Sequence, residues 1–240
     1  MSTDAHKAAF FDVDNTLLDA KSMFAFQSFY LDIWLPAHSP DRSPHSESFA
    51  QFSNRFARYT EHHDRPALNR LFYESYAGHS QASMRDAAVK WFAQLEKRSG
   101  SLWIAPAVRL AQELRNQGHL LVAVSGSSHE ILAPLIERLA FDDCLATRLE
   151  VDGDRFTGRI LPPQMIGAGK GEALREWALR RGVDLQCSVA AGDHLTDLQM
   201  LECVGRPHVV AGDALLEQIA VERGWPILRT TATDDFVIHA

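Results

Sequence analysis

The sequence is poor in cysteine, in long apolar runs and in clustered positive charge. Its 240 residues include three cysteines, Cys144, Cys187 and Cys203, an odd number without C-x-x-C spacing. This argues against a disulfide scaffold and against a zinc ribbon. Residues 1–8 lack the apolar run of a signal peptide, and no apolar stretch is long enough to span a bilayer. These absences predict a protein of the reducing cytoplasm with no membrane partner.

The charge balance is acidic. The chain carries 31 Asp and Glu against 24 Lys and Arg, a formal net charge of −7. No cluster of Lys and Arg offers a track for a phosphate backbone, so a nucleic-acid partner is not expected. A local pocket can still bind a small anion, because its own charges outweigh the net charge. The length suits one generous domain, or a core domain with a smaller insertion.

Short apolar runs alternate with helical patterns along most of the chain, which favours a parallel sheet wrapped by helices. The strongest runs are residues 8–11, 120–124 and 187–191, and weaker ones lie at 143–147, 207–210 and 226–228. Helical patterns cover residues 106–117, 130–139, 171–181 and 214–223. The alternating stretch 149–161, around Asp152-Gly153-Asp154, predicts a β-hairpin. The predicted fold class is α/β, a Rossmann-like doubly wound parallel sheet with a β-hairpin.

The segment from residue 21 to residue 102 follows a different pattern. It is rich in aromatic residues at helical spacing and has no convincing buried strand. We predict an inserted helical cap domain at 21–102, between the two parts of the catalytic core, 1–20 and 103–240. The proline-punctuated stretch 36–48 is expected to be a mobile loop. The aromatic stripe is expected to form a small core of the cap's own.

Acidic residues follow two of the strongest strands, Asp12 and Asp14 after the first, Asp193 and Asp197 after the third. In an open parallel sheet such strand ends line one crevice. Paired carboxylates suit a divalent cation, or a nucleophile beside a proton carrier. Four crowded carboxylates repel one another unless a cation offsets them, and hard oxygen ligands favour Mg²⁺ over zinc or copper. Simple capping of the following helix would also explain Asp193 and Asp197.

Two further motifs stand at expected helix starts. The serine-rich stretch 125–128 follows the second strand and can hold an anion with its hydroxyl and N–H groups. Plain N-capping by Ser127 or Ser128 would account for it as well. Lys170 lies between two glycines, and a lone lysine at such a place is usually solvated surface.

The order and spacing of these four motifs resemble the haloacid dehalogenase superfamily of phosphohydrolases. The motifs are D-V-D-N-T after the first strand, S-G-S-S after the second, the later lysine, and G-D-x-x-x-D after the third. The helical insertion resembles the cap of the branch that includes phosphoserine phosphatase, subfamily IB. The resemblance implies a phosphoric monoester hydrolase that requires Mg²⁺ and acts on a small phosphorylated metabolite through an aspartyl-phosphate.

The resemblance also implies a role for each site residue. Asp12 would be the nucleophile, and Asp14 the general acid that protonates the leaving oxygen and then the base that activates water. Ser125 and the N–H of Gly126 would bind the phosphoryl oxygens. Lys170 would offset their charge and that of Asp12.

The implied metal ligands come from the first and last motifs. Asp12, the backbone carbonyl of Asp14, and Asp193 would hold Mg²⁺. Asp197 would support them, and Thr16 would orient the nucleophile loop.

The sequence departs from the family pattern at His194, where a small residue is common, and at Thr196, where asparagine is frequent. These departures bear on substrate preference or loop geometry. The cap also lacks the Glu and Arg pair with which phosphoserine phosphatases hold the amino acid, so phosphoserine is only one candidate. Arg55 and Arg58 are candidates for contacting an anionic substrate, although an exposed helix face explains them equally well.

Two other functions remain open: a phosphotransferase that acts on a small alcohol, and a catalytically silent protein that binds a phospholigand. A silent protein has no need of Asp12, Asp14, Lys170 and Asp193 together, which disfavours the second. Neither the substrate nor the oligomeric state follows from the sequence.

Overall fold

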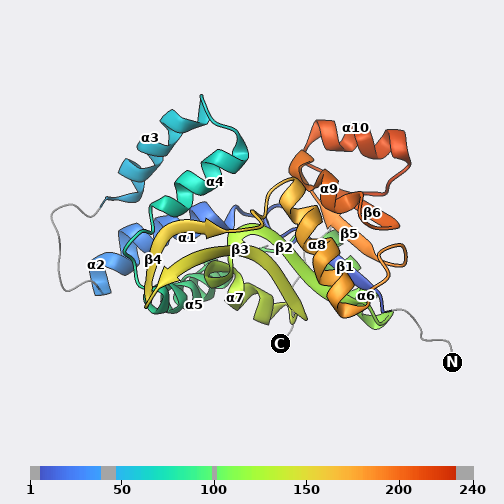
Figure 1. Ribbon diagram of the computed structural model, residues 1–240, viewed down its shortest axis with the longest axis horizontal. Coiled ribbons are helices and arrows are strands. Elements are labelled where there is room, and N and C mark those ends of the chain that lie inside the picture. The colour runs from blue at the N-terminus through green and yellow to red at the C-terminus, as the bar shows by residue number, and fades with distance from the viewer. Residues whose placement is uncertain (1–5, 39–46, 99–101, 231–240) are drawn as a thin grey trace.

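The computed structural model describes residues 6–38, 47–98 and 102–230. A seven-stranded sheet in the order β4-β3-β2-β1-β5-β6-β7 has helices on both faces (Figure 1). Its neighbouring strands are parallel except for β3 and β4, which form an antiparallel hairpin. The strands are β1 (Ala8–Phe11), β2 (Leu120–Ser128), β3 (Asp143–Asp152), β4 (Arg155–Leu161), β5 (Val189–Gly192), β6 (Arg206–Val210) and β7 (Ile227–Leu228). The predicted Rossmann-like α/β class and its hairpin are confirmed.

The central strand explains why the sheet is covered twice. In β1, Ala8 and Phe10 point to one face and Ala9 and Phe11 to the other, and all four are fully buried. A strand buried on both faces must be apolar throughout, as this run is. One face packs against α8 (Ala168–Arg181), α9 (Leu198–Leu201) and α10 (Ala214–Arg223). The other packs against α6 (Ala105–Asn116) and α7 (His129–Arg138).

The helices between β1 and α6 form what we call the cap segment, the described residues 21–38 and 47–98. They are α1 (Ser22–Phe29), the π-helix η1 (Tyr30–Trp34), α2 (Leu35–His38), α3 (Phe49–Thr60), α4 (Arg65–Glu74) and α5 (Gln81–Arg98). Its buried aromatics belong to the same cluster as Ala9 and Phe11 of β1, so they do not form a separate core as expected. The predicted mobile loop at 36–48 is wrong at residues 36–38, which form the end of helix α2, and residues 39–46 lie outside the described residues.

The hairpin β3–β4 supports the cap segment. Gly78 N–H donates to the Phe156 carbonyl at 2.8 Å, and Gln81 N–H donates to the Asp154 carbonyl at 2.7 Å. Arg155 donates from Nη1 to the Gly78 carbonyl at 2.6 Å. The cap segment is therefore anchored to the sheet through the hairpin as well as through its apolar core. Among the described residues, no helix has the length and apolarity needed to cross a membrane.

Two of the element boundaries that differ from the expectation bear on the cavity described below. β2 continues to Ser128 instead of ending at residue 124, with a register shift against β3 between Ser125 and Ser128. The serine stretch is therefore an irregular extension of the strand and not the start of a helix. α8 begins at Ala168, three residues earlier than the apolar pattern indicates, which places Lys170 in its first turn.

Candidate active site

A tight turn at the end of β1 presents the first pair of acids. Asp12 N–H donates to the Ala191 carbonyl of β5 at 2.9 Å, which extends the sheet by one residue. The Val13 carbonyl then accepts hydrogen bonds from three N–H groups of residues 16–18. Asn15 has a φ of +58°, in the left-handed region that asparagine tolerates better than most residues. The turn places Asp12 and Asp14 in the wall of one cavity.

This cavity has a volume of about 300 Å³ and lies at the carboxyl ends of β1, β2 and β5. Ligand sites of small molecules begin at about this size. Among the residues that line it are all but one of the predicted site residues: Asp12, Asp14, Ser125, Gly126, Lys170, Asp193 and Asp197. The exception, Thr16, lies behind the wall and donates from Oγ1 to Asp193 Oδ1 at 2.9 Å. The four motifs therefore converge on one place.

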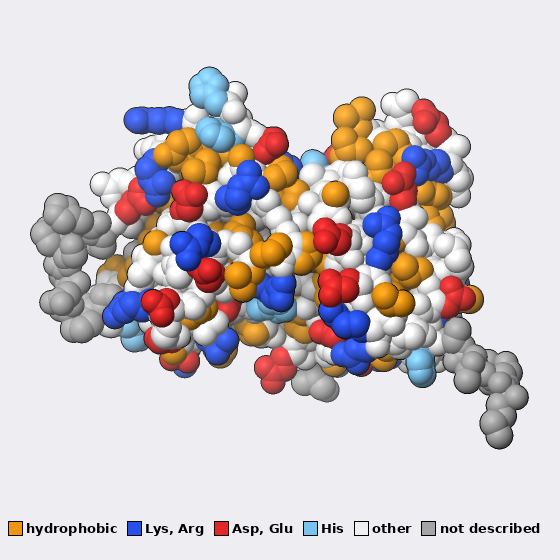
Figure 2. Space-filling view, viewed as in Figure 1, with side chains coloured by type: hydrophobic (Ala, Val, Ile, Leu, Met, Phe, Trp, Pro, Cys, Tyr) orange, Lys and Arg blue, Asp and Glu red, His pale blue; other side chains and the backbone are white. Residues whose placement is uncertain are grey.

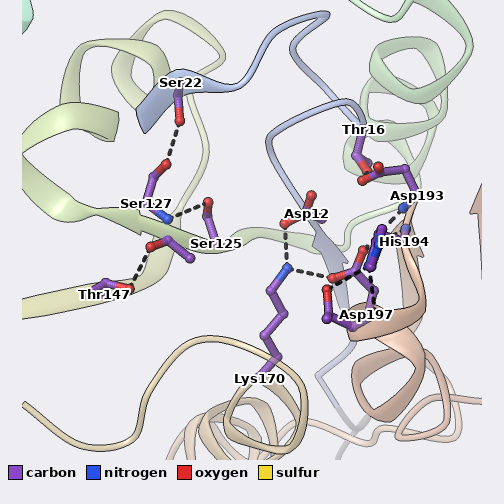
Figure 3. Close-up of polar contacts among 12 residues, drawn as sticks. Asp12, Thr16, Ser22, Ser125, Ser127, Thr147, Lys170, Asp193, His194 and Asp197 are labelled. Carbon is purple, nitrogen blue, oxygen red and sulfur yellow. Dashed lines mark hydrogen bonds and ion pairs between the residues drawn. The ribbon is translucent and has the colours of Figure 1, made fainter. Parts of the chain in front are cut away.

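Lys170 is buried, with an exposed fraction of 4%, so it is not the solvated surface residue that its flanking glycines alone would indicate. Its Nζ donates to Asp12 Oδ1 at 2.5 Å and to Asp197 Oδ1 at 2.6 Å (Figure 3). Burial by itself lowers the pKa of Lys170, but these two carboxylates raise it above its usual value, and the side chain stays charged. A Cβ at Gly169 would lie 1.7 Å from the Gln164 carbonyl oxygen, so only glycine allows this close approach.

Asp197 has a double role in the structure. Its Oδ2 accepts hydrogen bonds from the N–H groups of Asp193 and His194, each at 3.2 Å, while its Oδ1 faces Lys170. Helix capping therefore explains one oxygen of Asp197, Oδ2, which accepts from the backbone N–H of His194 at the start of the short 3₁₀ helix η2 (Leu195–Asp197). A Cβ at Gly192 would lie 2.7 Å from the Asp197 carboxylate, which explains the glycine before Asp193.

Three carboxylates form a set that suits a hard cation. Asp12, Asp193 and Asp197 each offer an oxygen within 4.8 Å of the others. Burial raises the pKa of Asp12 well above its usual range, and although Lys170 opposes this, both neighbouring acids add to it. Burial and Asp197 likewise raise the pKa of Asp193. A divalent cation among these oxygens would relieve the repulsion, and oxygen ligands of this kind suit Mg²⁺.

Asp14 is distinct from this set. Burial raises its pKa to about 6, against the opposing effect of hydrogen bonds from Ser22. Its Oδ1 is buried and has no hydrogen-bond partner in the described part of the chain. A carboxyl group that exchanges its proton near neutral pH and keeps one oxygen unpaired is suited to proton transfer.

The serine stretch of β2 lines the same cavity as the carboxylates. Ser127 N–H donates to Ser125 Oγ at 3.1 Å, and Ser127 Oγ lies 2.5 Å from Ser22 Oγ at the start of α1. Ser128 is the residue before α7, but its side chain makes no capping hydrogen bond. Plain N-capping therefore does not explain the serines.

One contact that the sequence did not indicate joins the cap segment to this stretch. The Gly126 carbonyl accepts hydrogen bonds from Asn69 Nδ2 at 3.1 Å, Tyr73 OH at 3.1 Å and Thr147 Oγ1 at 2.7 Å. Asn69 and Tyr73 belong to α4, and Thr147 to β3. The polar character of Asn69 and Tyr73 within a buried face of α4 is the signal that could have singled them out.

The cap side of the cavity differs from what the sequence suggested. Arg55 donates to Glu47 at 2.7 Å and does not line the cavity, nor does Arg58. Two other cations, Lys21 and Arg65, do line it, although nothing in the sequence distinguished them. The phase of each helix relative to the sheet decides which basic residue faces the cavity.

The family model of haloacid dehalogenase-like hydrolases matches residues 9–202. The chain belongs to this family. Among relatives of this hydrolase, an "inhibition of morphological differentiation protein" of Streptomyces azureus is 34% identical over 224 residues, 92% of this chain and 77% of that protein. A probable phosphatase of Mycobacterium tuberculosis is 32% identical over 225 residues, 93% of this chain and 75% of the other.

Solved structures show the same fold. A Bordetella pertussis protein of unknown function aligns with a TM-score of 0.78 at 22% identity, over 93% of this hydrolase and 98% of that chain. A phosphoserine phosphatase in its apo form aligns with a TM-score of 0.60 at 20% identity, over 89% and 90%. The resemblance drawn from the motifs is confirmed. The family and its phosphatase-named relatives support a phosphatase, that is, a phosphoric monoester hydrolase.

Proposed function

We propose that this chain is a Mg²⁺-dependent phosphatase that hydrolyses a small phosphorylated metabolite through an aspartyl-phosphate on Asp12. The observation that carries the proposal is the pairing of Asp12 with the buried ammonium of Lys170 in a cavity of about 300 Å³. A carboxylate is held there beside a fixed positive charge, next to hydroxyl and N–H donors. Phosphoryl transfer depends mainly on such alignment and charge.

In the first step, the Ser125 hydroxyl and the Gly126 N–H hold the phosphoryl oxygens. Lys170 binds one oxygen of Asp12, and the other oxygen attacks phosphorus in line with the leaving oxygen. The bond from Asp12 to phosphorus forms while the bond from phosphorus to the alcohol oxygen breaks. Lys170 offsets negative charge on both reacting groups.

Asp14 moves the proton. It enters as the protonated acid, for which its raised pKa of about 6 is suitable, and protonates the departing alcohol. As a carboxylate it then takes a proton from water, which attacks the aspartyl-phosphate and releases phosphate. Asp12 is thereby regenerated as a carboxylate, and Asp14 is again protonated.

Asp12, the backbone carbonyl of Asp14, and Asp193 would hold Mg²⁺, with Thr16 fixing Asp193. The ion supplies positive charge that lets a phosphate dianion approach the four carboxylates. Asp197 keeps Lys170 and the loop after β5 in place. We propose a cytoplasmic enzyme that acts on a small phosphorylated metabolite.

The decisive test measures phosphate release from a generic aryl phosphate and from a panel of phosphorylated metabolites, with Mg²⁺, with chelator, and with Mg²⁺ restored in excess. We expect activity to vanish in chelator and to return with Mg²⁺, without any alcohol acceptor. Mg²⁺ should also raise the melting temperature of the wild type, but not of Asp193→Asn. Glu176→Gln, which removes an exposed acid remote from the cavity, serves as the matched control. Full activity in chelator contradicts the proposal.

A further inference from the structure

The cavity has a floor, formed by the loops after β1 and β5 together with Lys170, and a cap side, formed by residues of the cap segment. The two sides differ in composition. Phe24, Phe56 and Phe72 line the cap side, together with the cations Lys21 and Arg65. None of the cap-segment residues that line the cavity, within the ranges that the structure describes, is acidic. The acids of the cavity all come from the loops after β1 and β5, where the proposed phosphoryl chemistry uses them.

The three phenylalanines form a packed wall. The Phe24 ring meets that of Phe56 at a centroid distance of 5.5 Å and that of Phe72 at 5.4 Å, both edge to face. Phe56 and Phe72 are buried, while Phe24 is half-buried. Such a wall offers an apolar group a preformed surface and no hydrogen-bond partner. On the outer surface of the lobe of α3 and α4, hydrophobic side chains are mixed with charged and histidine side chains (Figure 2).

The two cations have no counterion among the residues that the structure describes. Neither Lys21 nor Arg65 makes an ion pair with another described residue. Arg65 is the first residue of α4, and the preceding Asp64 is engaged in capping, with Oδ1 accepting from Ala67 N–H at 2.9 Å. Arg65 lines the same cavity as His194 and Asp193 of the loop after β5.

We propose that the alcohol part of the substrate is an apolar skeleton that carries an anionic group, such as a carboxylate, remote from the phosphate ester, and no ammonium group. The proposal rests on the phosphatase function proposed above. The skeleton contacts the phenylalanine wall, and the anion pairs with Arg65 and Lys21. Both cations would repel an ammonium group, and no cap-segment residue that lines the cavity, among those described, offers a carboxylate to balance its charge. The site therefore selects against it. Phosphoserine, which carries an ammonium group, is therefore a poor substrate.

The test uses three monoesters whose remote substituent is anionic, neutral or cationic: benzyl phosphates with a carboxymethyl, a methyl or an aminomethyl group in the para position. The substituent is insulated from the ester, so the three leaving alcohols have similar basicity. We expect kcat/KM to be highest for the carboxylate and lowest for the ammonium ester. We expect kcat/KM to be about tenfold higher for the carboxymethyl-substituted benzyl phosphate than for the methyl-substituted one, which corresponds to one charge-assisted hydrogen bond.

Substitutions then assign the effect. The charge preference is the kcat/KM of the carboxymethyl-substituted phosphate divided by that of the methyl-substituted one. Lys21→Gln and Arg65→Gln should each lower this ratio, and the double variant should bring it to about one. Arg65→Glu should turn the preference toward the ammonium ester. Arg58→Gln removes an exposed arginine of α3 that does not line the cavity, and it should leave the ratio unchanged. Melting temperatures check that each variant is folded.

The outcomes separate this inference from the function on which it rests. Equal turnover of the three esters, best turnover of the ammonium ester, or an unchanged ratio in the double variant overturns the inference and leaves the phosphatase intact. No phosphate release from these esters and from a generic aryl phosphate, with Mg²⁺ present, overturns both.

Discussion

The floor and the cap side of the cavity are built on different principles. On the floor, Asp12, Lys170 and Asp197 are buried and joined by hydrogen bonds of 2.5 and 2.6 Å. On the cap side, Lys21 and Arg65 are exposed and make no ion pair with a described residue. A reacting group needs a fixed position, whereas a group that selects a substrate can complete its partnerships when the substrate binds.

The Gly126 carbonyl is where the two sides meet. Two of its three hydrogen-bond donors, Asn69 and Tyr73, come from the cap segment, and Thr147 comes from the sheet. The peptide that follows this carbonyl carries the Ser127 N–H, which donates to Ser125 Oγ. The cap segment is thereby coupled to the orientation of a proposed phosphate ligand.

The largest effect is expected on the floor, from Asp12→Asn. Without a nucleophile no phosphoenzyme can form, and turnover should fall to background with every substrate. Lys170 keeps its partner Asp197, and one of several crowded acids is removed, so the melting temperature should not fall. Rapid-quench labelling and thermal unfolding measure the two outcomes. Substantial turnover by this variant would place the chemistry elsewhere.

Asp14→Asn should have the next largest effect. Loss of the proton carrier should slow turnover of an alkyl phosphate by about 10²–10⁴-fold. An aryl phosphate has a better leaving group, so its first step should survive, while the aspartyl-phosphate lacks the base for its hydrolysis. We expect a burst of phenol and an accumulated phosphoprotein that is stable in acid and labile in base. Labelling of Asp12→Asn but not of Asp14→Asn would reverse the two roles.

A smaller effect is expected where the two sides meet. Asn69→Ala removes one donor from the Gly126 carbonyl, which keeps Tyr73 and Thr147. The free energy of unfolding should fall by about 1 kcal/mol, and kcat/KM should fall about tenfold because the loop loses part of its orientation. Asn54→Ala, at an exposed position of α3, is the matched control. A loss of stability without any loss of kcat/KM would show that the contact is only structural.

The floor could be anticipated from the sequence because it depends on topology. Asp12, Ser125 and Asp193 follow three strands that are neighbours in the sheet, so the carboxyl ends of β2, β1 and β5 bring them together wherever the helices lie. The sheet itself was predictable because its buried strands are continuous apolar runs. The roles of these residues remain predictions that the variants above test.

The cap side could not be anticipated because it depends on helix rotation. Arg55, Arg58 and Arg65 are all basic residues on amphipathic helices, and which of them faces the cavity is decided by packing between distant segments. The burial of Lys170 was also hidden. Its flanking glycines have meaning only beside the Gln164 and Gln199 backbone, which approaches them from other parts of the chain.

The smallest effect is expected from Arg55→Gln, although the sequence offered Arg55 as a contact for an anionic substrate. Its guanidinium forms two hydrogen bonds with Glu47, at 2.9 and 2.7 Å, and lies over the Phe52 ring at 5.5 Å. The pair is 41% and 32% exposed, so solvent screens it and the free energy of unfolding should fall by less than about 1 kcal/mol. Because Arg55 does not line the cavity, kcat/KM should stay unchanged for esters of every charge. Measuring kcat/KM of Arg55→Gln and of Arg65→Gln with the same esters compares two arginines of the cap segment. If Arg55→Gln changed the charge preference as much as Arg65→Gln, long-range charge would govern selection, and the division between a lining cation and a surface cation would be wrong.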